Sequence, residues 1–170
     1  MPVEIITESG LDFHFEQERL FRPEAENFYQ RLASKYSIKI CDMIYLSNNG
    51  ELWFMEVKSS APREPGNFVQ DIHKKFLDSL LIYVGAYADR KNTSADYLPP
   101  VLQNPAILSG KIRLILIVKD YPEDKLVSLQ DSLYKECRAF EKLFSLEKTV
   151  VYNQDKARRF LRIPIHPSSS

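Results

Sequence analysis

The sequence has 170 residues, of which 44% are hydrophobic, 12% aromatic and 27% charged. This is the length and composition of one ordinary globular domain, and it excludes wholesale disorder, collagen-like repeats and a small disulfide-stapled scaffold. The 23 basic and 23 acidic side chains give a net charge of zero, so no global positive field marks a nucleic-acid-binding protein. We therefore expect a single domain over residues 1–170, in which any nucleic acid is held locally.

Cysteine placement and the N-terminal residues predict the compartment. Cys41 and Cys137 are far apart and lack the spacing of a zinc site, which favours free thiols in a reducing environment. The N-terminus lacks the charged and apolar regions of a secretion signal, and no apolar run approaches the ~20 residues needed to span a bilayer. The expectation is a cytoplasmic protein that does not associate with a membrane.

The chain begins with a predicted β-hairpin and a predicted helix. Apolar residues alternate on both sides of the Glu8-Ser9-Gly10 break, which predicts an N-terminal hairpin over residues 1–16. Apolar residues then recur at helical spacing over residues 23–36, with Pro23 tolerated in the first turn. This segment is predicted to be an amphipathic helix.

A second hairpin is the clearest local signal. Residues 38–47 and 51–59 are predicted strands joined by Asn48-Asn49-Gly50, whose glycine suits the left-handed position of a three-residue loop. With this loop, residues whose numbers sum to 98 face each other, so Asp42 opposes Glu56. Both faces of the hairpin are mostly apolar, which is typical of central strands covered by helices on both sides. We therefore expect an α/β sandwich.

The second half of the chain continues the alternation of helices and strands. Residues 88–110 contain three prolines and no clear periodicity, so they are predicted to pack irregularly or form a lid. Together the elements predict a central mixed sheet flanked by helices. The other predicted elements are a helix over 67–87, a strand over 111–119, a helix over 125–144, a strand over 149–152, a turn or short helix over 155–162 and a loose tail over 163–170.

Three ionisable residues stand in the second hairpin. Asp42, Glu56 and Lys58 are predicted to share one face of strands that are otherwise apolar. An unpaired buried charge would cost several kcal/mol, so these groups must pair or carry chemistry. Two carboxylates and the carbonyl of Val57 offer the hard oxygen ligands that Mg²⁺ prefers, and Lys58 can orient or deprotonate a bound water.

These residues resemble a known family. Asp42, thirteen intervening residues and then Glu56-Val57-Lys58 at the end of an apolar strand resemble the motif of the PD-(D/E)xK nuclease superfamily. The predicted helices at 23–36 and 67–87 stand where that superfamily has helices, and the resemblance covers about residues 18–152. It implies a restriction-endonuclease-like fold and a Mg²⁺- or Mn²⁺-dependent nuclease acting on nucleic acid, with DNA favoured over RNA.

The resemblance also implies residue roles. Asp42 and Glu56 match the metal-binding acids, with the Val57 carbonyl as a further ligand, and Lys58 matches the catalytic lysine. Cys41 departs from the pattern, because it stands where the superfamily's name has a proline.

Many members of that superfamily add a glutamate from the first helix. Glu26 or Glu24 could supply it, and Glu26 is preferred because Pro23 places Glu24 nearer the fraying end. Members also use polar residues on the helix after the ExK strand. The candidates here to contact substrate or water are Gln70, Lys74 and Lys75.

Other interpretations stay open at this point. The neutral charge favours a catalytically inactive nuclease-fold module that binds nucleic acid or protein. Alternatively, Asp42, Glu56 and Lys58 form a purely structural ion network. The segment 158–162 could contact phosphates or be a solvated turn. A homodimer would supply two sites for two strands, and no interface signature decides for or against it.

Overall fold

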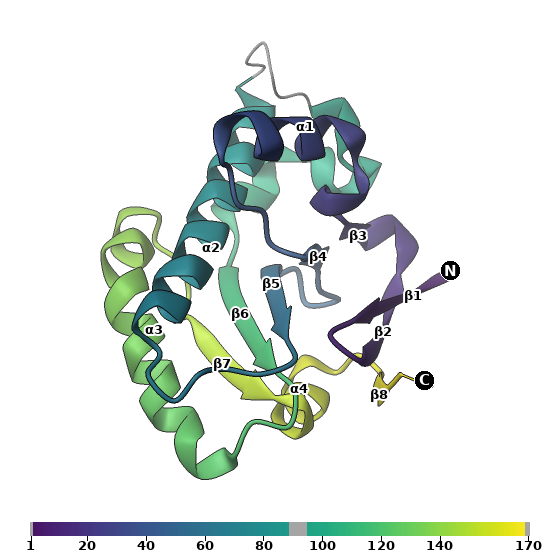
Figure 1. The fold of residues 1–170 in the computed structure, drawn as a ribbon. Helices are drawn as coiled ribbons and strands as arrows, with labels where there is room; N and C mark the ends of the chain where they lie inside the picture. Colours follow the sequence, from purple (N-terminus) through teal and green to yellow (C-terminus); the bar gives the residue numbers. More distant parts are fainter. Residues whose placement is uncertain (1, 89–94, 169–170) are drawn as a thin grey trace.

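A computed structural model describes residues 2–88 and 95–168 (Figure 1). In these residues the chain forms a five-stranded mixed sheet and a three-stranded antiparallel sheet with helices around them, an α/β architecture. The strands are β1 (Val3–Glu8), β2 (Leu11–Glu16), β3 (Leu20–Phe21), β4 (Met43–Leu46), β5 (Leu52–Lys58), β6 (Ile112–Val118), β7 (Val150–Asn153) and β8 (Ile165–Pro167). The α-helices are α1 (Asn27–Tyr36), α2 (Gly66–Tyr87), α3 (Glu123–Leu143) and α4 (Gln154–Leu161).

The five-stranded sheet has the order β3-β4-β5-β6-β7, so the predicted central hairpin lies in its middle. Strands β4 and β5 pair antiparallel with Ile44 opposite Phe54, and this confirms the predicted register. The turn closes with Gly50 at a φ of 80° and its N–H donating to the Ser47 carbonyl at 2.9 Å. Strands β5, β6 and β7 run parallel, as βαβ connections through α2 and α3 require.

Strand β4 is shorter than the segment 38–47 predicted from the sequence. The backbone before Met43 is bonded to α2 instead of to a neighbouring strand. The N–H of Lys39 donates to Asp78 Oδ2 and the N–H of Cys41 donates to Ser79 Oγ, each at 2.8 Å. Side chains of α2 therefore replace the ladder partners, which a pattern of apolar residues does not reveal.

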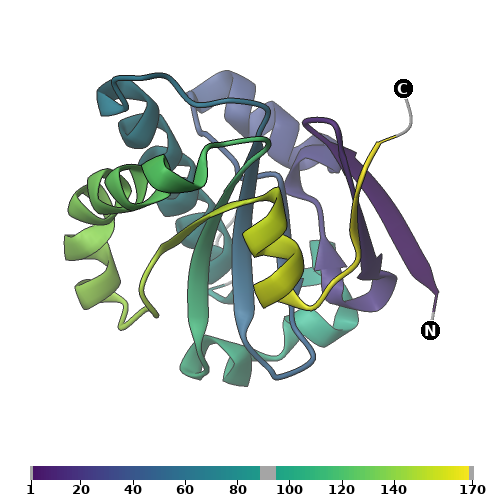
Figure 2. The ribbon, with the colours of Figure 1, turned by 90° about the horizontal axis from the view of Figure 1, so that it is seen from below.

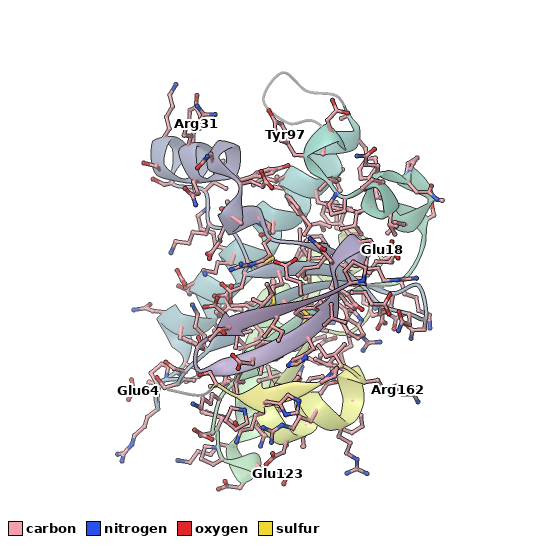
Figure 3. All side chains as sticks on the ribbon, turned by 90° about the vertical axis from the view of Figure 1, so that its right-hand side faces the viewer. Glu18, Arg31, Glu64, Tyr97, Glu123 and Arg162 are labelled. Carbon is pink, nitrogen blue, oxygen red and sulfur yellow. The ribbon has the colours of Figure 1, made fainter. Side chains whose placement is uncertain are left out.

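The two faces of the central sheet carry different layers, as Figure 2 shows from below. One face packs against α2 and α3 around Phe54, Phe76 and Leu133. The other face packs against the β1-β2-β8 sheet and α4 around Phe13 and Met55. Figure 3 looks onto this second side, with the antiparallel β1–β2 pair lying across it. A second sheet thus covers much of the face where helices were predicted.

The C-terminal segment corrects a prediction. Residues 163–170 were expected to form a loose tail, but residues 165–167 form β8, which pairs antiparallel with β2. Ile163 and Ile165 are buried in the core beneath this sheet. The carbonyl of Ile165 also accepts a hydrogen bond from Arg158 Nε at 2.8 Å. Alternate apolar residues in a short polar segment are enough to complete the edge of a small sheet.

The predicted first helix begins later than expected. Pro23–Ala25 is a separate 3-10 turn (η2), and Glu26 is extended, with φ −89° and ψ 115°, before α1 starts at Asn27. The region predicted to pack irregularly contains three more 3-10 segments in its described part: Ala95–Tyr97, Pro100–Gln103 and Pro105–Ser109. One further 3-10 turn, Gln17–Arg19, joins β2 to β3.

No helix in residues 2–88 and 95–168 is long and apolar enough to cross a membrane.

Candidate active site

The candidate site lies where β4 begins and β5 ends. Asp42 stands immediately before β4 and is 7% exposed, and Glu56 on β5 is fully buried. The Oδ2 atom of Asp42 accepts a hydrogen bond from the N–H of Val57 at 2.7 Å. The carboxylate thus takes a backbone donor just beyond the last β4–β5 pair, Met43 with Met55. This bond fixes Asp42 beside the strand that carries Glu56, as the register predicts.

One oxygen of Glu56 holds two cations. The ammonium groups of Lys58 and Lys75 each lie 2.7 Å from Oε1. The other oxygen, Oε2, is buried and has no hydrogen-bond partner in the part of the chain that the structure describes. Buried polar atoms without a partner are rare and call for an explanation such as an ion or a water. Glu56 therefore presents a free, buried acceptor next to Asp42.

Electrostatics tie Asp42, Glu56 and Lys75 together. Burial raises the pKa of Asp42 well above its ordinary value of 3.8, and the charge of Glu56 raises it further. The Val57 N–H and Lys75 act in the opposite direction. Burial by itself would lower the pKa of Lys75, but the contact with Glu56 outweighs it and the pKa is raised. Lys75 is therefore held in its charged form by Glu56, while Asp42 has its pKa raised chiefly by burial.

The turn between β1 and β2 reaches this site from the far side of the sheet. Ser9 Oγ donates to the carbonyl of Val57 at 3.1 Å, which leaves the second lone pair of that oxygen for another partner. Glu8 acts electrostatically on Asp42 and is in turn influenced by Glu56. Burial raises the pKa of Glu8, and the charge of Glu24 raises it further. Sequence reasoning missed Ser9 and Glu8, because the hydrogen bond that brings their turn to the site joins residues 48 positions apart.

The structure separates the three candidates on the helix after β5. Lys75 contacts Glu56 directly and belongs to the site. Lys74 instead pairs with Asp78 at 2.6 Å on the exposed side of α2. Gln70 is exposed on the same helix. Their spacing on a polar helix face could not distinguish one inward lysine from its outward neighbours.

The two candidate glutamates of the first helix also differ in their surroundings. Glu24 acts electrostatically on Lys75 and Glu8, so its charge faces the site. Glu26 stands at the start of α1 and acts on Tyr29. The sequence preferred Glu26, whereas the geometry favours Glu24, because the 3-10 turn before α1 places it there rather than at a fraying helix end.

A cavity of about 550 Å³ gives access to this side of the site. Glu24 and Lys75 line it together with residues of α1, α2 and the segment between α1 and β4. Lys58 reaches solvent on its own, with a side chain that is 31% exposed. Glu56 itself is fully buried and does not line the cavity, so Lys75 is its link to that cavity.

The residues present can be tested against a divalent cation. In residues 2–88 and 95–168 no group of three His, Cys, Asp or Glu side chains is arranged to hold a metal ion. Two carboxylates and a carbonyl are nevertheless a hard oxygen set, and Mg²⁺ usually keeps several waters. The buried Oε2 of Glu56, which has no hydrogen-bond partner among the described residues, is an oxygen that could bind a cation. Asp42, Glu56 and the Val57 carbonyl thus fit such an ion.

No protein-family model, curated protein or solved structure matches this chain.

Proposed function

We propose that this protein is a Mg²⁺- or Mn²⁺-dependent nuclease of the PD-(D/E)xK type that hydrolyses phosphodiester bonds of nucleic acid, with DNA favoured over RNA. The observation that carries the proposal is the buried Glu56 beside Asp42: Lys58 and Lys75 contact one of its oxygens, and the other has no hydrogen-bond partner among the described residues. A divalent ion held by Asp42, Glu56 and the Val57 carbonyl would supply an activated water and a counter-charge to the phosphate.

The lysines of this site have distinct proposed roles. Lys58 is part-exposed at the end of β5, so it can hold the attacking water and later face the charge that grows on the phosphoryl oxygens. Lys75 is more buried and stays bound to Glu56, so it fixes the orientation of that carboxylate. Glu24 lines the access cavity with Lys75 and can accept a hydrogen bond from water there.

The test is a cleavage assay on single- and double-stranded DNA and RNA with Mg²⁺ or Mn²⁺. Lys58→Ala is compared with Lys142→Ala, which removes an exposed lysine at the end of α3. We expect metal-dependent cutting by the wild type and by Lys142→Ala, with a loss of at least 100-fold in Lys58→Ala. Full activity of folded Lys58→Ala would refute the role of this lysine. If the wild type cleaves none of the substrates, the proposed nuclease activity is refuted.

A second candidate is a catalytically inactive module of the same fold that binds nucleic acid or protein. The observation that favours it is the double ion pair, because Lys58 and Lys75 already neutralise Glu56 without a metal. In that case the ion network is structural, and removing one partner chiefly destabilises the fold. A divalent ion would then leave the melting temperature unchanged, while a working metal site would raise it.

A further inference from the structure

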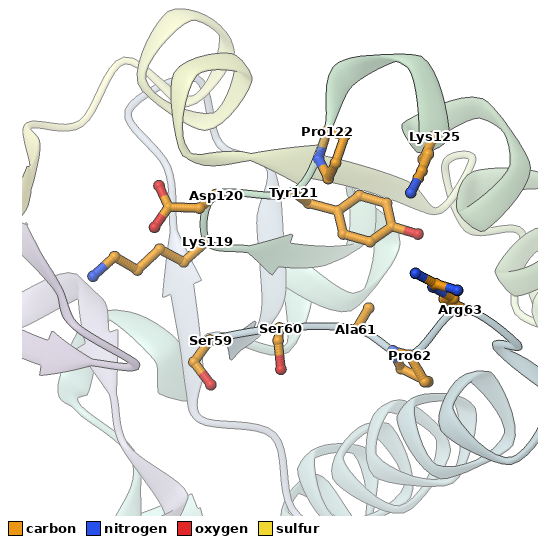
Figure 4. A pocket seen from close by; sticks show the side chains of 10 residues that line it. All are labelled: Ser59, Ser60, Ala61, Pro62, Arg63, Lys119, Asp120, Tyr121, Pro122 and Lys125. Atoms are coloured by element: carbon orange, nitrogen blue, oxygen red, sulfur yellow. The ribbon is translucent and has the colours of Figure 1, made fainter.

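A second pocket begins one residue beyond Lys58. It has a volume of about 580 Å³ and lies between the segments that follow the parallel strands β5 and β6 (Figure 4). The two segments are joined where the N–H of Lys119 donates to the carbonyl of Lys58 at 2.8 Å. In open α/β sheets ligands bind outside the carboxyl ends of parallel strands. Because a strand rises about 3.3 Å per residue, this pocket is adjacent to the proposed reaction centre.

The pocket carries an excess of positive charge. Arg63, Lys119 and Lys125 line it, and Asp120 is the one acid in its lining. In the described residues none of these three cations makes an ion pair. Asp120 is engaged elsewhere, since its Oδ1 accepts a hydrogen bond from Gln154 at 2.9 Å. The cations are therefore available to an anionic ligand.

The side chains divide the pocket into two ends. In Figure 4 the head groups of Arg63 and Lys125 point into the same part of the pocket as the ring of Tyr121. Lys119 points the other way, and its Nζ lies close to Gly10 of the β1–β2 turn. The ring of Tyr121 is partly exposed. Proteins bind unpaired nucleotides with these two features, because cationic side chains contact the phosphates and an aromatic ring stacks on a base.

We propose that this pocket binds one nucleotide of a single-stranded nucleic acid segment next to the scissile phosphate. Arg63 and Lys125 contact the phosphodiester, and the ring of Tyr121 stacks on the base. This inference rests on the proposed function, because the scissile phosphate is placed at Asp42 and Glu56. The nucleic acid strand then leaves the reaction centre across the ends of β5 and β6, and this part of the substrate is unpaired.

Binding without turnover tests the proposal separately from catalysis. A fluorescein-labelled 12-nucleotide single-stranded DNA is titrated with the full chain in EDTA, and anisotropy is followed over a range of salt concentrations. The double variant Arg63→Gln/Lys125→Gln is compared with Lys135→Gln/Lys142→Gln, which removes the same charge from exposed positions of α3. We expect the salt slope of log K to fall in magnitude by about 0.7 for each lost phosphate contact in the first variant only.

Further comparisons distinguish a single-stranded nucleotide from a duplex and from a free phosphate ion. Tyr121→Leu is expected to weaken binding of the single strand about fivefold or more, while Tyr121→Phe keeps the stacking ring and the affinity. The same sequence as a duplex should bind more weakly than the single strand and be insensitive to Tyr121→Leu. Inorganic phosphate at constant ionic strength should displace the strand only weakly, because a free anion lacks the base.

The outcomes are decisive in either direction. If Arg63→Gln/Lys125→Gln binds the single strand as tightly as the wild type does, and the wild type cleaves nucleic acid, the proposed nucleotide pocket is refuted and the proposed nuclease activity stands. Displacement by millimolar phosphate without any effect of Tyr121→Leu would assign the pocket to a small anion and overturn the nucleotide site. Loss of binding in that double variant, in a protein that never cleaves, would support the pocket while refuting the nuclease.

Discussion

The ammonium group of Lys75 lies 2.7 Å from Oε1 of Glu56, so α2 delivers a cation to a fully buried carboxylate at the end of β5. Lys58 reaches the same oxygen from its own strand. The other oxygen, Oε2, is buried and has no hydrogen-bond partner among the described residues. The two oxygens of this carboxylate thus differ: one is paired with two ammonium groups, and the other is buried without a hydrogen bond from the described residues.

Removing Lys75 should destabilise the fold. In Lys75→Met, Glu56 keeps Lys58 as its one ion-pair partner among the described residues, so a buried charge loses one of the two cations that compensate it. We expect the free energy of unfolding to fall by about 2–4 kcal/mol, measured by urea denaturation. Lys74→Met is the matched control, because it breaks an exposed pair and should change stability by less than about 0.5 kcal/mol. Equal losses of stability in Lys75→Met and Lys74→Met would contradict the assignment of Lys75 to the buried ion pair.

Replacing Asp42 should stabilise the metal-free protein. The pKa of Asp42 is raised in the folded state. The protonated acid therefore contributes stability that is fully present below the ordinary pKa of 3.8 and is lost as the pH rises through the raised pKa. Asp42→Asn keeps an acceptor for the Val57 N–H and removes the charge. We expect a melting temperature several degrees above wild type at pH 8 in EDTA, with the gap closing at pH 4. A variant that melts lower than wild type at both pH values would contradict this.

A divalent ion should stabilise the wild type. Mg²⁺ or Mn²⁺ at 100 times its dissociation constant adds about 2.7 kcal/mol, and each kcal/mol raises the melting temperature by about 2–4 °C at this size. Glu56→Gln and Asp42→Asn should abolish that response, and Glu141→Gln, on α3, serves as the control. A response that survives in both site variants would place the ion elsewhere.

Glu51 should link stability to acid pH. Burial would raise its pKa, but hydrogen bonds from Arg113 and Trp53 outweigh burial and lower it. A lowered pKa contributes stability that is present above the ordinary value of 4.5 and is lost as pH falls through the folded pKa. We expect Glu51→Gln to flatten the decline of stability below pH 5, measured by thermal unfolding at stepped pH. If Glu51→Gln loses stability below pH 5 as steeply as the wild type does, the proposed role of the Glu51–Arg113 ion pair is contradicted.

The C-terminal strand should contribute to the core. Ile165 is buried between the two sheets, so Ile165→Ala should lower the free energy of unfolding by about 2–4 kcal/mol. Ser168→Ala removes only a hydroxyl from the next segment and should be close to neutral. Urea denaturation of both variants gives the comparison. A neutral Ile165→Ala would mean that residues 165–167 do not pair with β2 in solution.

The sequence predicted the centre of the fold well because local chemistry specifies it. The Asn48-Asn49-Gly50 loop allows one register, and that register places Asp42 beside β5 near Glu56. Long apolar repeats were enough to place α2 and α3, with ends within two residues of the observed ones. The same patterns missed β8 and placed Pro23–Ala25 inside a helix, because short segments take their structure from the core that they meet.

The sequence by itself determined that Asp42, Glu56 and Lys58 stand together, since strand periodicity and one turn connect them within 17 residues. Only the tertiary structure decided which helix lysine joins them, that Glu24 rather than Glu26 faces them, and that Ser9 bonds to the Val57 carbonyl. Those contacts depend on how distant elements pack, and packing is set by the whole core rather than by neighbours in the chain.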